Sequence, residues 1–132
     1  MKSEKYGLLT AVHILNRIWC NDLEIALHEV NFWEDLLISL DVDIDAVTST
    51  HDDTRKTELG RLHHFRRLVK RLLEEIQNLD KQMATRVCIN HVLDTDTRLN
   101  HQYLREEMDS FQADFRIFKT EIRQYVTAQP TF

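Results

Sequence analysis

Seven histidines and two cysteines are the residues of this sequence that could most readily bind a metal ion. A zinc site on one helix face uses His-x-x-x-His, and ferritin-like bundles bind two iron ions through Glu-x-x-His motifs. Neither spacing occurs in the sequence, and there is no Cys-x-x-Cys. Most of the histidines fall on polar helix positions, so we interpret them as surface residues.

A zinc site assembled from several helices is the remaining metal hypothesis. The side chains that antiparallel helices would bring to one half of a bundle are His13, His91, His101, Cys20 and Cys88. The heptad register directs Cys88 and His91 outward, whereas His101 points inward one step before Leu104. We therefore predict no metal ligands, reduced thiols, and a partly buried, hydrogen-bonded His101 near one end of the bundle.

An acidic segment partly matches a calcium-binding loop. Positions one, three, five, nine and twelve of the loop correspond to Asp41, Asp43, Asp45, Ser49 and Asp52. Position six is Ala46, where the loop requires glycine, and Asp52 is shorter than the bidentate glutamate of position twelve. We expect a solvated acidic loop without calcium.

A basic stretch lies in the middle of the chain. Its members are Arg61, His63, His64, Arg66, Arg67, Lys70 and Arg71. Most of them lie off the apolar seam, so we expect a solvated face that pairs with acids on neighbouring helices. The formal net charge of −5 is unfavourable for binding nucleic acid, and none is expected.

Catalytic motifs are not apparent. With two glycines, the sequence cannot form the usual glycine-rich phosphate loop, and no nucleophile motif or pair of catalytic carboxylates stands out. We predict no catalytic residues, no cofactor-binding residues and no enzyme activity.

The same scarcity of glycine, with a single proline, predicts few turns and therefore a few long elements. The fold expected is all-α in a single domain, residues 1–132. No apolar run of about 18 residues is present, so no membrane span is expected. The first five residues do not resemble a secretion signal, and a cytoplasmic location is the default expectation.

Three segments have helical periodicity. The first covers about residues 6–40, where polar residues recur every three or four positions along one face. Two interpretations remain open: one continuous helix, or a break at Cys20–Asp22, where Asn21 or Asp22 caps a new helix and the bundle has four helices. The apolar face of this segment begins with Leu8, Val12, Leu15 and Trp19.

The second and third segments, about 57–93 and 97–126, have heptad seams typical of coiled coils. In the second segment the seam residues are Leu62, Phe65, Val69, Leu72, Ile76, Leu79 and Met83. In the third they are Leu104, Met108, Phe111, Phe115, Phe118, Ile122 and Tyr125. With a loop at 41–56 and a tail at 127–132, the similar lengths predict an up-down-up bundle of three antiparallel helices.

Two stretches carry a resemblance to known proteins. One is residues 23–40, which contain Asn31-Phe32-Trp33-Glu34-Asp35-Leu36-Leu37; the other is His64-Phe65 with its seam, followed by Leu104-Arg105-Glu106-Glu107-Met108 and the phenylalanines after it. Over about residues 23–126 they resemble uncharacterised small bacterial helical-bundle proteins. That resemblance implies a helical bundle, and it transfers no activity and no functional residues.

The functional expectation comes from surplus apolar residues near the end of the first segment. Between residues 31 and 40 only four positions are polar, and one groove of a three-helix bundle cannot cover the rest. We therefore expect protein–protein contacts, including a homodimer centred near Phe32 and Leu36. The alternative is a bundle that binds a metal ion or a small ligand.

Overall fold

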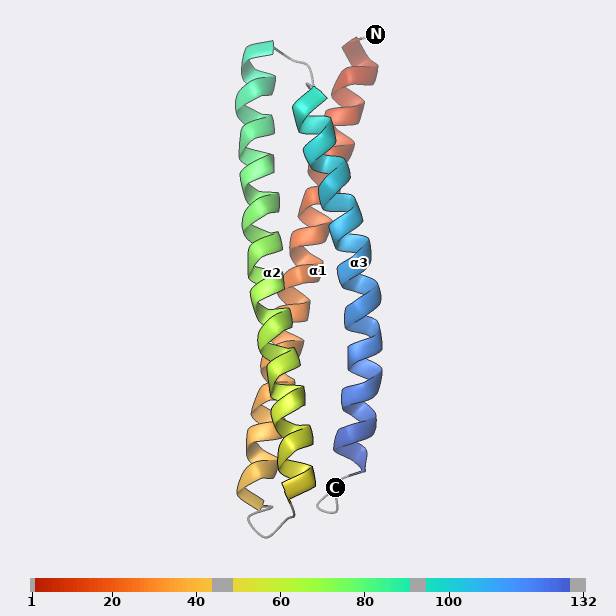
Figure 1. The fold of residues 1–132 in the computed structure, drawn as a ribbon. Coiled ribbons are helices and arrows are strands. Elements are labelled where there is room, and N and C mark those ends of the chain that lie inside the picture. Colours follow the sequence, from red (N-terminus) through yellow and green to blue (C-terminus); the bar gives the residue numbers. More distant parts are fainter. Residues whose placement is uncertain (1, 44–48, 91–94, 129–132) are drawn as a thin grey trace.

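The computed structural model consists of three long α-helices: α1 (Lys2–Asp43), α2 (Ser49–Asn90) and α3 (Thr95–Thr127). It describes residues 2–43, 49–90 and 95–128, with side chains at 10–40, 53–85 and 96–128. The helices run up, down and up along one rod, so the start of α1 and the end of α3 lie at opposite ends (Figure 1). The all-α, three-helix prediction is confirmed.

α1 is continuous through Cys20–Asp22, so the interpretation with one helix is correct. The residues on both sides of this point, Trp19 and Leu23, are both buried and remain in phase on the core face. Because that face is uninterrupted and no glycine or proline occurs nearby, a helix start at Asp22 would gain no packing.

The expected loop at residues 41–56 is wrong in its extent. α1 continues to Asp43 and α2 already begins at Ser49, eight residues before the expected start. Aspartate, serine and threonine have only modestly unfavourable helix propensity, up to about 0.7 kcal/mol per residue, so they do not terminate a helix by themselves. Serine and aspartate are also favoured at a helix N-terminus. The Thr57 hydroxyl donates at 3.0 Å to the backbone carbonyl of Asp53, which lies in this added segment.

The other helix boundaries differ from prediction by a few residues, which is normal for helix ends. α1 begins at Lys2 instead of residue 6, and α2 ends at Asn90 instead of residue 93. α3 covers Thr95–Thr127, slightly more than the predicted 97–126.

The core follows the predicted seams with two changes. All seven seam residues of α2 are buried, as are the first six of α3. At the end of α3, Val126 is buried and Tyr125 only partly buried. In α1, Leu15 of the predicted apolar face is only partly buried, and its neighbour Asn16 is buried instead.

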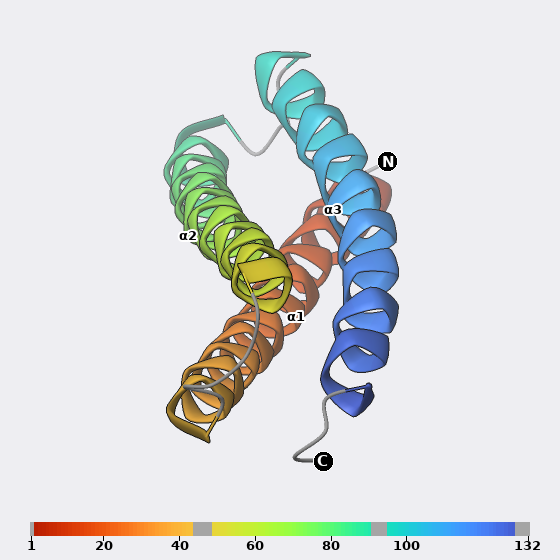
Figure 2. The same cartoon turned by 60° about the horizontal axis from the view of Figure 1, so that its bottom comes forward.

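Aromatic side chains join α2 to α3. The ring of Phe65 lies 5.3 Å from that of Phe115 and 5.0 Å from that of Phe118, measured between centroids. The guanidinium of Arg61 covers the outer face of Phe118 at 4.7 Å. α1 and α3, by contrast, diverge toward the end of the rod where α3 ends, in both views (Figures 1 and 2).

Candidate functional site

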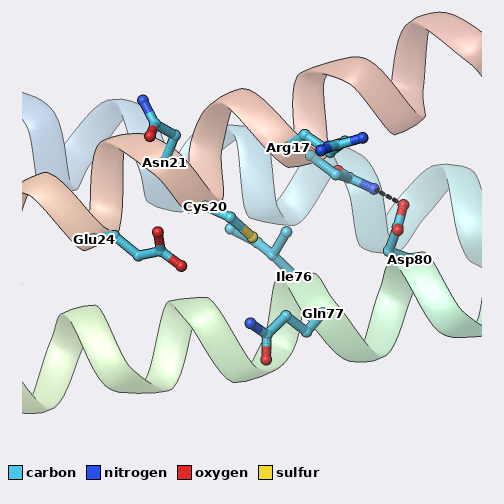
Figure 3. A pocket seen from close by; sticks show the side chains of 8 residues that line it. Arg17, Cys20, Asn21, Glu24, Ile76, Gln77 and Asp80 are labelled. Atoms are coloured by element: carbon cyan, nitrogen blue, oxygen red, sulfur yellow. Dashed lines mark hydrogen bonds between the residues drawn. The ribbon is translucent and has the colours of Figure 1, made fainter.

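A polar hollow of about 300 Å³ lies between α1 and α2. α1 supplies Asn16, Arg17, Cys20, Asn21 and Glu24, and α2 supplies Ile76, Gln77 and Asp80. Figure 3 shows Cys20 and Ile76 between the two helices, with the polar side chains spread on either side of them. The hollow thus offers amide, carboxylate and guanidinium groups around a small apolar floor.

Asn16 is the deepest polar residue of the hollow, with 1% of its surface exposed. Its amide nitrogen donates to Asp80 Oδ1 at 3.1 Å, and the same oxygen lies 2.9 Å from His13 Nδ1. Asn16 Oδ1 is buried and has no hydrogen-bond partner. A buried amide oxygen without a donor costs free energy, so this position is tolerated rather than optimal for stability.

Sequence reasoning missed Asn16, although its spacing contained the signal. Positions 12, 16, 19 and 23 alternate in steps of four, three and four, which is the seam spacing found in the other helices. Leu15 is the apolar residue at this step, but the register places residue 16 in the seam.

Cys20 is a free, partly buried thiol at the wall of the hollow. Burial raises the pKa of this thiol, and the carboxylates of Glu24 and Asp80 raise it further. The neutral thiol is therefore favoured, which makes Cys20 a poor nucleophile and a poor metal ligand.

His101 faces the bundle, as predicted, and is buried against α1. Its imidazole stacks on Trp19 with ring centroids 5.1 Å apart and an interplanar angle of 23°. Its Nε2 is buried without a hydrogen-bond partner, so the expected hydrogen bond is not made at this atom. Burial lowers the pKa of His101, and the positive charge of Arg105 lowers it further.

Among the side chains that the structure describes, the remaining metal-binding candidates are not brought together into a site. His13, His28, His63 and His64 are exposed, as expected, whereas the side chains of His91 and Cys88 lie outside the described residues. In the part of the chain whose side chains are described, no three His, Cys, Asp or Glu residues are grouped to hold an ion.

The calcium-loop candidates also lie mostly outside the description. Asp45 is not described, and the other four have helical backbone with side chains that are not described.

Three arginines of the basic stretch, Arg61, Arg66 and Arg71, pair with acids of neighbouring helices, as predicted. Arg61 contacts Glu121 of α3 at 2.6 Å, and Arg71 contacts Glu107 of α3 at 3.6 Å. Arg66 is bidentate, with Nη1 donating to Glu34 and Nη2 to Asn31, both at 2.9 Å. The hydrogen bond from Arg66 lowers the pKa of Glu34, and burial opposes this effect.

A row of exposed apolar residues runs along the outward face of α1. The residues of this outward row are Ile14, Ile18, Ile25 and Phe32, which are 49–58% exposed. Their steps of four and seven keep them on one line of the helix. Leu36, four residues beyond Phe32, continues the line but packs partly against the core. Of the two residues proposed for self-association, Phe32 is therefore the more accessible.

Comparisons with known proteins return no relatives. No protein-family model, no curated protein and no solved structure matches the chain. Among the described residues, no helix is both long enough and apolar enough to cross a bilayer.

Proposed function

We propose that this chain is a non-enzymatic helical bundle that acts through protein–protein contacts, including self-association through the outward row of α1. The observation that supports the proposal is the exposure of Phe32, whose side chain is 58% accessible in line with three exposed isoleucines. Scattered single apolar residues are normal on protein surfaces, but a continuous row is typical of an interface.

The energetic reason is burial of apolar area. Covering an aliphatic or aromatic side chain fully contributes roughly 1.5–3 kcal/mol. Phe32 is about half exposed and Leu36 less so, so each contributes a part of that amount. Two-fold symmetry doubles the contribution, because each residue is buried once in each subunit.

The experiment is sedimentation of the purified chain at micromolar concentration. We expect dimers from the unaltered protein and monomers from the double variant Phe32→Glu, Leu36→Lys, with helicity in circular dichroism retained. A control on another helix is Leu99→Glu, which should leave the dimer intact, since Leu99 is 63% exposed on α3 and is not part of the row. A monomeric unaltered protein would refute self-association.

A small polar ligand in the hollow between α1 and α2 is the second candidate function. It is favoured by the unpartnered Asn16 Oδ1 and by a volume at the lower limit of known ligand sites. Metal analysis and an absorbance spectrum of purified protein test for a metal ion or a coloured ligand, and native mass spectrometry tests for a colourless polar one. A stoichiometric ligand that is lost in Asn16→Leu supports this candidate.

A further inference from the structure

The groove between α1 and α3 combines a partly apolar wall with a basic wall. It has a volume of about 380 Å³ at mid-length. Its lining comprises Asp22, Ile25, Ala26 and Glu29 of α1, and Phe111, Gln112, Phe115, Arg116 and Lys119 of α3.

The cations of α3 gather on one flank, which also carries one acid, Asp109. The cations of this helix are Arg98, Arg105, Arg116, Lys119 and Arg123. They follow one another at intervals of 7, 11, 3 and 4 residues, so they share one flank. This flank is on the side of α1, because Lys119 contacts Glu29 at 3.1 Å and Arg116 lines the groove.

The opposite flank of α3 is acidic and is neutralised by α2. Glu107 and Glu121 contact Arg71 and Arg61, respectively. The basic flank has no such partner helix: within the described residues, only Lys119 among its five cations forms an ion pair.

On the α1 wall of the groove the acids Asp22 and Glu29 alternate with Ile25 and Ala26, and among the described residues Glu29 pairs with Lys119 alone. Beside these acids, Ile18 and Ile25 lie seven residues apart on α1 and are each 49% exposed. An occupant of the groove therefore needs apolar side chains toward α1 and negative charge toward α3.

We propose that this groove binds a helix of a partner protein that has an apolar ridge and an acidic flank. Such a helix completes a four-helix bundle, in which the fourth helix covers the open side of a three-helix arrangement. From Arg98 to Arg123 the basic flank is roughly 37 Å long, which corresponds to about 25 helical residues. The occupant is identified by charge complementarity, which fixes partner choice and orientation at interfaces.

The test uses two fluorescein-labelled synthetic helical peptides with the same leucine ridge. One carries glutamate along the flank beside the ridge, and the other carries lysine at those positions. Fluorescence anisotropy is measured with the unaltered protein and with the triple variant Arg105→Glu, Arg116→Glu, Arg123→Glu. We expect the glutamate peptide to bind the unaltered protein at least about tenfold more tightly than the variant, with affinity falling as salt rises.

A matched control reverses three exposed cations on the outward face of α2, in Arg67→Glu, Lys70→Glu, Lys81→Glu. This control has the same net charge as the α3 variant. If binding depends on the cations of α3 themselves, the control should bind the glutamate peptide as tightly as the unaltered protein does. If the α3 variant does not fold, the triple glutamine variant at the same positions removes the charges without reversing them. Ile25→Gln should also weaken binding, because it interrupts the apolar wall.

Several outcomes would overturn the proposal. One is equal affinity of the chain for both peptides. Another is a loss of affinity in the α2 control as large as in the α3 variant. A third is no binding of the glutamate peptide at low salt. Binding to vesicles of phosphatidylcholine and phosphatidylserine that depends on Arg116, without peptide binding, would identify a lipid surface instead. Ile25 belongs both to this groove and to the outward row of α1. A chain that sediments as a monomer presents the whole groove, so failure of self-association leaves this proposal standing.

Discussion

The imidazole of His101, in the first half of α3, stacks on the indole of Trp19 of α1 with 5.1 Å between ring centroids. The ring is 8% exposed, and its Nε2 has no hydrogen-bond partner. Protonation would place a charge in this site next to Arg105, which explains why the pKa of His101 is lowered.

Stability should therefore depend on pH through His101. Because its pKa is below the ordinary 6.5 in the folded chain, the unfolded chain binds this proton more readily. The contribution to stability is complete at pH values above 6.5 and declines as the pH falls through 6.5 toward the folded-state pKa. The free energy of unfolding can be measured with urea at about pH 7.5 and 5.5. Its decrease between the two pH values should be smaller in His101→Phe, which keeps the stacked ring, than in the unaltered chain.

The control for this pH dependence is His28→Gln, because His28 is exposed on α1. It should leave the pH dependence close to that of the unaltered chain. An undiminished pH effect in His101→Phe would show that other groups cause it.

Phe115 tests the register of α3. Its side chain is 5% exposed and lies among the rings of Phe65, Phe111 and Phe118. Phe115→Ala should lower the free energy of unfolding by about 3–5 kcal/mol. Exposed Gln112, changed to alanine, should lower it by less than about 0.5 kcal/mol. Equal effects in a urea titration would contradict the assigned core face.

Asn16 tests whether the polar position in the α1 seam reduces stability. Asn16→Leu removes the unpartnered buried Oδ1 and fills the seam with an apolar side chain, so stability should rise by about 1 kcal/mol. Asp80 keeps its contact with His13 in this variant. A decrease in the denaturant midpoint would mean that the Asn16–Asp80 hydrogen bond outweighs the buried oxygen.

Calcium should not stabilise the chain. A working site between residues 41 and 52 would raise the melting temperature by mass action. Ala46 occupies the position where the loop requires glycine, so we expect no shift at millimolar calcium. A reproducible upward shift that disappears in Asp43→Ala would reverse this conclusion.

The sequence by itself determined the all-α fold and the core faces of α2 and α3. Seam residues such as Leu72 and Phe118 repeat every three or four positions, and that spacing leaves them on one side of any helix they form. Ion pairing of the basic stretch was likewise predictable, because Arg66 and Arg71 lie off that seam.

Tertiary structure decided what local patterns leave open. α2 begins at Ser49, within a segment of weak helix propensity. No local signal in that segment shows whether it belongs to the helix or to the loop. Val126 replaces Tyr125 in the core, because only the neighbouring helices define the exact core direction. The groove beside Arg116 also depends on the distance between α1 and α3, and a helical period defines the face of each helix but not the spacing between helices.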